Sequence, residues 1–148
     1  MQVPKASFCA VILTMQCLPA VAHDHATGVV RERMEMMENM AKRMKTIRER
    51  IDRKRDLDAI KTDAEAIASQ APHLVHLFPP GSTQKPTGAR SAIWQQWADF
   101  ERKANGLEAE SKKLITASPD DYGGMSAQVR TVSQTCVACH EKYRAKRR

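Results

Sequence analysis

The stretch that decides the fold is MSAQVRTVSQTCVACHEKY, residues 125–143. Its apolar and thiol side chains recur at intervals of three and four, which is the period of one face of an α-helix. They are Met125, Val129, Val132, Cys136, Cys139 and Tyr143. The stretch is therefore predicted to be an amphipathic helix that carries both cysteines on its buried stripe.

The same period occurs in two earlier stretches. The first runs from Gly28 to Arg53, and its inward positions are Val30, Met37, Met40, Met44, Ile47 and Ile51. The second follows a charged turn at 53–55, and its inward positions are Leu57, Ile60, Ala64, Ile67 and Ala71. Pro72 ends this second helix, because proline cannot continue one.

A long connection precedes the third helix. Residues 73–90 contain prolines and glycines that prevent a regular helix, so we expect a loop. Ser91 is expected to cap a helix with inward positions Ile93, Trp97, Phe100, Ala104, Leu107, Ser111 and Leu114. No stretch alternates polar and apolar residues as a strand would. The predicted fold is all-α, an antiparallel four-helix bundle, whose cofactor sites are built between facing helices.

Size and charge exclude two classes of protein. The chain has 148 residues, enough for one domain, with 24 Lys and Arg against 17 Asp and Glu and a net charge of +7. The basic residues are mixed with acids along the chain instead of forming one aromatic-studded patch, so nucleic acid is not an expected partner. The longest mostly apolar run, residues 6–18, is shorter than the roughly 18 residues that a membrane span needs, so no membrane span is expected.

The first residues have the features of a secretory signal peptide. A single charge at Lys5 precedes a mostly apolar run at 6–18, and residues 20–22 are Ala-Val-Ala, the small-x-small pattern that signal peptidase reads. We expect cleavage after residue 22, which leaves 23–148 as the mature domain in the periplasm. A buried N-terminal helix is the alternative, and it is disfavoured by the abrupt change to His-Asp-His at 23–25.

The chemistry is carried by Cys136-Val137-Ala138-Cys139-His140, which has the C-x-x-C-H spacing of a c-type haem attachment site. Two thiols at this spacing share a helical face and can add to the two vinyl groups of one porphyrin, and the adjacent imidazole can bind the iron. We predict one covalently attached haem c, with Cys136 and Cys139 as attachment points and His140 as an axial ligand. A zinc site, which needs four protein ligands, and a redox dithiol, which favours a βαβ setting, are the weaker alternatives.

Other segments extend the pattern to the whole mature chain. They are Arg33-x-x-x-Met37, the loop Leu77-Phe78-Pro79-Pro80-Gly81-Ser82, the helix Ile93-Trp94-x-x-Trp97-x-x-Phe100 and the ending Glu141-Lys142-Tyr143-Arg144 after the motif. Together they resemble the class II c-type cytochromes, which comprise cytochrome c′ and its low-spin relatives of the cytochrome c-556 type. The resemblance implies a four-helix bundle that encloses one haem.

The resemblance also suggests what occupies the second axial side of the iron. Met37 stands where the low-spin relatives have the methionine that binds iron through its thioether, and Met40 or Met36 could take its place. Five methionines crowd this helix, however, and a methionine stripe at helical spacing is often flexible core filler. In that case the iron is five-coordinate, as in cytochrome c′, and Met37 only roofs an open pocket.

Further residues complete the predicted haem pocket. Arg33 lies one turn before Met37, where its guanidinium could pair with a haem propionate; the alternative is an exposed arginine in a charged run. Trp97 and Phe100 are expected to pack in the core or against the porphyrin. Tyr143 belongs to the inward stripe, and Arg144 follows His140 by one turn.

These residues predict a periplasmic electron carrier with a low-spin, His140/Met37-ligated haem, which exchanges electrons with acidic redox partner proteins. The alternative is a five-coordinate haem protein that binds nitric oxide or carbon monoxide, as the resemblance to cytochrome c′ implies. No distal acid–base pair is evident, so an enzyme is not predicted. The sequence leaves monomer and homodimer equally open.

Overall fold

The computed structural model describes residues 26–146 of the chain. Its elements, in order, are α1 (Gly28–Asp52), α2 (Leu57–Gln70), the 3-10 helix η1 (Ala71–Leu77), α3 (Ala92–Gln95), α4 (Trp97–Thr116) and α5 (Tyr122–Tyr143). Within residues 26–146 there is no strand, and a single antiparallel bridge pairs Ala89 with Arg144. The predicted all-α class is confirmed.

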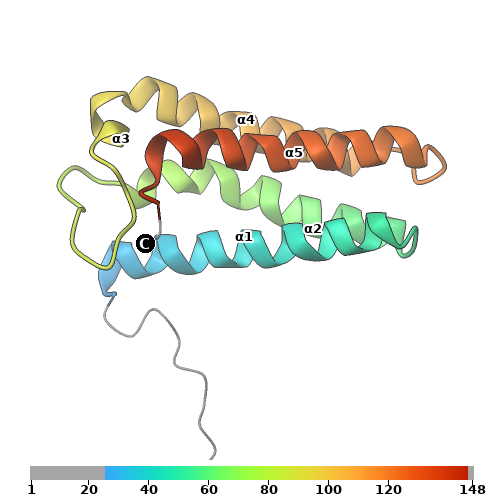
Figure 1. Ribbon diagram of the computed structural model, residues 1–148, viewed down its shortest axis with the longest axis horizontal. Helices are drawn as coiled ribbons and strands as arrows, with labels where there is room; N and C mark the ends of the chain where they lie inside the picture. The colour runs from blue at the N-terminus through green and yellow to red at the C-terminus, as the bar shows by residue number, and fades with distance from the viewer. Residues whose placement is uncertain (1–25, 147–148) are drawn as a thin grey trace, which may run out of the picture.

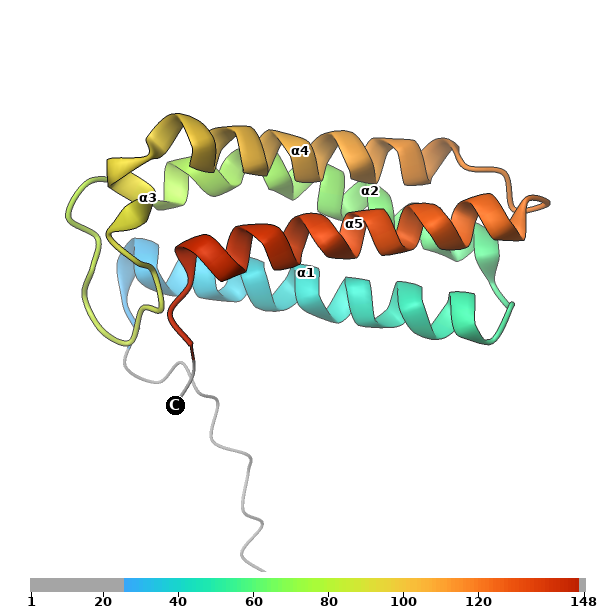
Figure 2. The same cartoon turned by 45° about the horizontal axis from the view of Figure 1, so that its top comes forward.

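The four long helices α1, α2, α4 and α5 form an antiparallel bundle (Figures 1 and 2). Helix α5 runs back along α1, so the end of α5 lies at the same end of the bundle as the beginning of α1. The loop from residue 78 to residue 91 and the short α3 gather at that end, whereas the α1–α2 and α4–α5 turns lie at the opposite end. The C-x-x-C-H motif is therefore near the end that carries the long loop.

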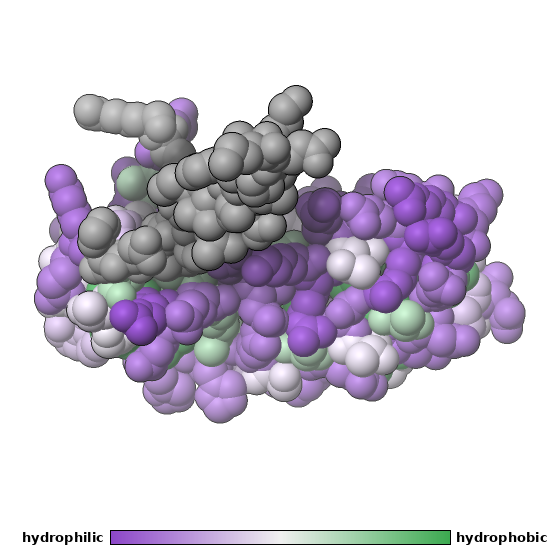
Figure 3. Space-filling view, turned by 90° about the horizontal axis from the view of Figure 1, so that it is seen from below, coloured by the Kyte–Doolittle hydropathy of each residue, from purple (hydrophilic) through white to green (hydrophobic). Residues whose placement is uncertain are grey.

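The core follows the predicted stripes, because each helix buries its apolar face against the others. Its fully buried large side chains include Ile47, Ile60, Ile67, Ile93, Leu114, Met125 and Val132. A view from below shows a predominantly hydrophilic surface with scattered apolar spots, as expected where amphipathic helices face water (Figure 3).

Two details of the connection differ from the sequence prediction. The α-helical part of the second helix ends at Gln70, and residues 71–77 continue as a 3-10 helix instead of a loop, with Pro72 in its first turn, where a missing N–H costs nothing. Ser91 does take the N-cap position of α3, but its side chain makes no capping hydrogen bond.

The third predicted helix is broken in two, and this changes the exposure of Trp97. Gln96 has φ −130° and ψ 46° between α3 and α4, so the three-four spacing does not continue in phase across it. Ile93 and Phe100 remain buried, but Trp97 is 37% exposed. Trp97 is therefore not enclosed in the core, and its packing against the porphyrin stays a prediction.

The predicted signal peptide, residues 1–22, lies outside the described residues and stays a prediction. From residue 26 to residue 146, none of the helices combines the length and the apolar character that crossing a membrane requires.

Candidate functional site

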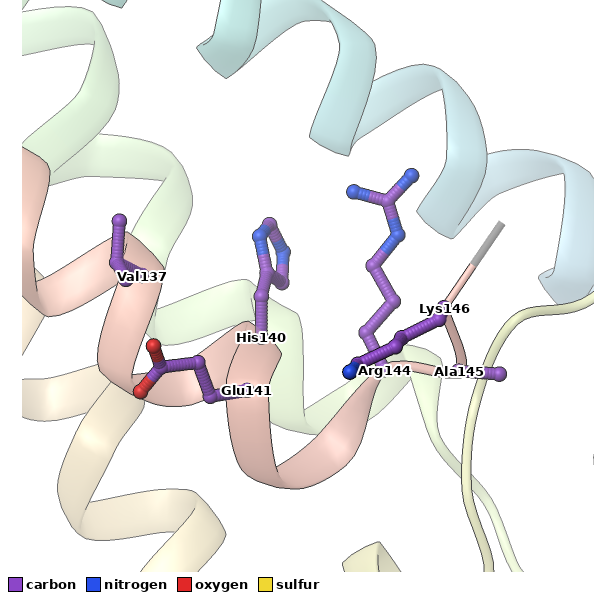
Figure 4. A pocket seen from close by; sticks show the side chains of 6 residues that line it. All are labelled: Val137, His140, Glu141, Arg144, Ala145 and Lys146. Carbon is purple, nitrogen blue, oxygen red and sulfur yellow. The ribbon is translucent and has the colours of Figure 1, made fainter. Parts of the chain in front are cut away.

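The C-x-x-C-H motif lies in the last two turns of α5, beside an open hollow. Cys136, Cys139 and His140 are partly buried, and the two thiols are free. The hollow has a volume of about 550 Å³ and is lined by Val137, His140, Glu141, Arg144, Ala145 and Lys146. Figure 4 shows the His140 imidazole and the Arg144 side chain extending from α5 toward α1. The cysteines are thus less buried than the sequence predicted.

Burial keeps the reactive side chains of the motif neutral. It raises the pKa of Cys136 and raises the pKa of Cys139 to about 11, so both are thiols at neutral pH. Burial, followed by the nearby charge of Arg144, lowers the pKa of His140. The imidazole is therefore neutral at pH 7, which is the form that binds a metal.

An aromatic cluster packs beside the motif. Phe100 is its centre, with ring centroids 4.9 Å from Phe78, 5.4 Å from Tyr143 and 5.5 Å from Trp97. The first two pairs are edge-to-face, the favoured arrangement of aromatic rings. Cys139 and Met37 both pack against this cluster. The predicted attachment thiol on α5 and the predicted ligand on α1 thus share one set of neighbours.

The three candidate methionines of α1 lie in different places. Met37 is partly buried and packs both on the aromatic cluster and on the main core. Met40 is 6% exposed and belongs to the main core alone. Met36 also packs on the main core, and it lines a separate groove beside Gln70 and Leu77.

Arg33 is almost fully buried, with 3% of its surface exposed. Its Nη1 donates to Ser82 Oγ at 3.0 Å and to the Leu77 carbonyl at 3.4 Å, and its Nη2 donates to the Ser82 carbonyl and to Thr87 Oγ1, both at 2.6 Å. The guanidinium carbon also lies 4.8 Å from the centroid of the Phe78 ring. An exposed arginine is therefore excluded. A contact with a haem propionate stays a prediction, and the propionate would have to share these donors with the loop.

A hydrogen-bonded group holds the last turn of α5 against α4. The Tyr143 hydroxyl donates to Asp99 Oδ2 at 2.6 Å, and Lys142 Nζ donates to the same oxygen at 2.8 Å. Together with Arg102, which also pairs with this carboxylate, they hold the pKa of Asp99 far below its usual range, with the Lys142 hydrogen bond as the largest cause. Sequence reasoning missed Asp99, because an acidic residue in the first turn of a helix is ordinarily explained by the helix dipole.

Arg144 is exposed and lines the hollow, and its backbone forms the bridge to Ala89. The structure thus gathers Met37, Phe100, Tyr143 and Arg144 at the end of the bundle that holds the motif. It leaves Met40 in the core and places Trp97 at the exposed edge of the aromatic cluster.

Comparison with known proteins now identifies the family. A sequence profile described as Cytochrome C′ matches residues 28–144. The chain belongs to the cytochrome c′ family.

Relatives and solved structures agree with this assignment. Cytochrome c-556 of Agrobacterium tumefaciens (strain II Chrys) is 36% identical over 92 residues, 62% of this chain and 75% of that protein. Cytochrome c-556 of Agrobacterium fabrum is 28% identical over 145 residues, 97% of each chain. Cytochrome c′ of Rhodopseudomonas palustris superposes with a TM-score of 0.76 at 28% identity, covering 83% of this chain and all of that one. A nitric oxide complex of a cytochrome c prime variant from Alcaligenes xylosoxidans gives a TM-score of 0.71 at 26% identity. The match covers 80% of this chain and 94% of that one.

The chain is accordingly a c-type haem protein with one covalently attached haem c. The described residues fit that group. Two free thiols three residues apart stand beside His140, which faces the open hollow, and the exposed Val137 between them also lines it. The bound haem supplies an iron that changes oxidation state or takes up a small ligand.

Proposed function

We propose that this cytochrome is a periplasmic monohaem electron carrier, in which His140 and Met37 bind the haem iron from opposite sides. Cys136 and Cys139 hold the porphyrin covalently on α5. In this proposal the protein moves electrons between other redox proteins and does not itself catalyse a reaction of a substrate. The net charge of +7 of the full chain, of which only Lys5 lies in the predicted signal peptide, favours partners with an acidic docking surface.

The observation that carries the proposal is the packing of Met37. Among the methionines at positions 36, 37 and 40, it is the one that packs on the aromatic cluster that also contacts Cys139. Met40 is enclosed in the main core, and Met36 lines the groove beside Gln70. A thioether on α1 that shares these neighbours with Cys139 of α5 would be placed to bind the haem iron.

Such a ligand pair suits electron transfer. A thioether favours ferrous iron and raises the reduction potential of a haem. If the iron keeps six ligands in both oxidation states, little has to rearrange when an electron arrives or leaves. The buried aromatic cluster helps, because close-packed side chains resist displacement.

Replacing Met37 tests the proposal. In the ferric holoprotein, Met37→Ala should abolish the weak methionine-to-iron charge-transfer band at the red end of the visible spectrum, and the reduction potential should fall. Met36→Ala is the matched control, since it removes a neighbouring thioether from the same helix and should leave both properties unchanged. A low-spin spectrum with an unchanged potential in Met37→Ala would show that Met37 is not the ligand.

Gas binding is the second candidate. Its support is the fold similarity to a cytochrome c prime that was solved with nitric oxide bound, together with the partial exposure of Met37. In this case the iron is five-coordinate and the reduced wild type binds carbon monoxide at a rate proportional to gas concentration. Under the electron-carrier proposal that rate instead reaches a ceiling set by dissociation of Met37.

Export is part of the proposal, because a c-type haem is attached on the far side of the inner membrane. The support is the signal-peptide pattern at residues 1–22. Intact-mass measurement of the secreted holoprotein should give a chain that begins at His23 and carries one haem. A mass that includes residues 1–22 would contradict this step.

A further inference from the structure

The long loop joins the two sides of the haem site through hydrogen bonds. At one end, Arg33 of α1 donates two hydrogen bonds to Ser82 and one to Thr87, at 2.6–3.0 Å. The Ser82 hydroxyl donates in turn to the Pro79 carbonyl at 2.8 Å. Arg33 therefore binds the loop with both of its terminal nitrogens, from a position one helical turn before Met37.

At its other end the loop holds the chain that follows His140. The Arg90 N–H donates to the Tyr143 carbonyl at 3.0 Å, and the Ala145 N–H donates to the Gly88 carbonyl at 2.8 Å. Thr87 connects the two ends, since its Oγ1 accepts from Arg33 and also from the Ala89 N–H, at 3.1 Å. A continuous path of hydrogen bonds thus runs from α1 through residues 82–90 to the end of α5.

This path matters because α1 and α5 have little other contact. They touch each other much less than α4 touches either α2 or α5, and the hollow beside His140 opens on the side that faces α1. Direct packing alone therefore constrains the spacing of α1 and α5 weakly at this end. The side chains of a binding site have to be held to within about 0.5 Å of their working positions. Hydrogen bonds that lead from a buried arginine can hold α1 and α5 in this way.

We propose that Arg33 is a positioning residue that, through residues 82–90, holds Met37 of α1 at the spacing from the end of α5 that keeps its thioether on the iron. The inference rests on the proposed function, since it takes Met37 as the ligand. This positioning role of Arg33 does not require contact with a haem propionate. The guanidinium suits this task because its planar fork can donate to several fixed oxygens at once, which a lysine ammonium does less well.

The test uses the haem-loaded protein and two kinds of variant. Arg33→Gln removes the guanidinium. Thr87→Val removes the hydroxyl that accepts from both Arg33 and the Ala89 N–H, and it leaves the positive charge of Arg33 in place. Arg31→Gln is the matched control, because it makes the same charge change two residues earlier on α1, where the side chain is exposed and bonds only to the nearby Ala26 carbonyl within the described residues. Thr87→Val also keeps the test decisive if Arg33→Gln does not fold.

Three readouts are expected to change together in Arg33→Gln and Thr87→Val, and to stay unchanged in the control. The methionine-to-iron band should lose intensity, and carbon monoxide should bind the ferrous protein about tenfold faster at saturating gas, the effect of losing one charge-assisted hydrogen bond. The Ala145 amide hydrogen should exchange faster by a similar factor. Arg33→Lys should restore the band in part.

The outcomes separate this inference from the proposed function. If Met37→Ala abolishes the band while Arg33→Gln and Thr87→Val keep both the band and the carbon monoxide rate, Met37 is the ligand and the positioning role of Arg33 is overturned. If Met37→Ala leaves the band intact, the proposed function is wrong, and the inference falls with it. If Arg31→Gln weakens the band as much as Arg33→Gln does, the effect is one of charge alone, and the positioning role is again refuted.

Discussion

Phe100→Ala should destabilise the protein and loosen the haem site at the same time. Phe100 is 3% exposed and its ring contacts Phe78, Tyr143 and Trp97. A buried aromatic side chain covers about 200 Å², which at about 25 cal/mol per Å² corresponds to about 5 kcal/mol. Measured truncations of buried phenylalanine cost about 3–5 kcal/mol, so we expect about 4 kcal/mol here.

Leu114→Ala provides a control of similar cost at a distant place. Leu114 is 0% exposed on the same helix, and its truncation should cost about 3 kcal/mol. It lies fourteen residues after Phe100, which is about 21 Å along α4. Because Met37 and Cys139 pack on the cluster of Phe100, only Phe100→Ala should also weaken the methionine-to-iron band.

The assay is urea unfolding of the ferric holoprotein, followed by far-ultraviolet circular dichroism, with the visible spectrum recorded before denaturant is added. Both variants should unfold at lower urea concentration with an unchanged slope. The reasoning would be refuted by a cost below about 1 kcal/mol for Phe100→Ala. It would be refuted equally if Leu114→Ala altered the visible spectrum as much as Phe100→Ala does.

Two further substitutions test polar groups of α4. Ser111 is 0% exposed and its hydroxyl has no hydrogen-bond partner among the described residues. Ser111→Ala should therefore stabilise the protein by about 1 kcal/mol in the same urea assay. Ser69→Ala, at an exposed site, is the control and should change stability by less than about 0.5 kcal/mol. The pKa of Asp99 is lowered on folding by Lys142 and Tyr143, so its contribution to stability is complete above the unfolded pKa of about 3.9 and is lost as the pH falls through the lower folded value. Asp99→Asn should therefore lower the melting temperature at pH 7, and the gap to wild type should close as the pH falls from about 4 toward 2; a gap independent of pH would contradict this account.

The success of the sequence predictions depended on how local the signal was. The inward positions of α1 and α2, and those of α5 other than the two cysteines, were predicted well, because a helix that continues unbroken keeps its three-four period. Ile47, Ile60 and Val132 are fully buried as expected. The period predicted Trp97 to be more enclosed than it is, because the backbone of Gln96 leaves the helical φ and ψ and no local sequence signal marks that break.

In the candidate site, too, the features set by neighbouring residues were predicted and those set by distant residues were not. The C-x-x-C-H spacing was readable because attachment chemistry needs two thiols and an imidazole close together in the chain. By contrast, the partners of Arg33 lie 44 to 54 residues away, so no local pattern could predict that its guanidinium binds the loop. Asp99 was missed for the same reason, since its partner Lys142 is 43 residues later.

The sequence by itself therefore determined the class of the protein: helical periodicity specifies the bundle, and C-x-x-C-H specifies the covalent haem. The tertiary structure decided which methionine shares the neighbours of Cys139, because Met36, Met37 and Met40 are alike in chemistry and differ only in direction around α1. It also decided that α1 and the end of α5 are joined through residues 82–90. Spacing along one helix cannot fix the distance between two helices, which depends on side chains brought together from remote parts of the chain.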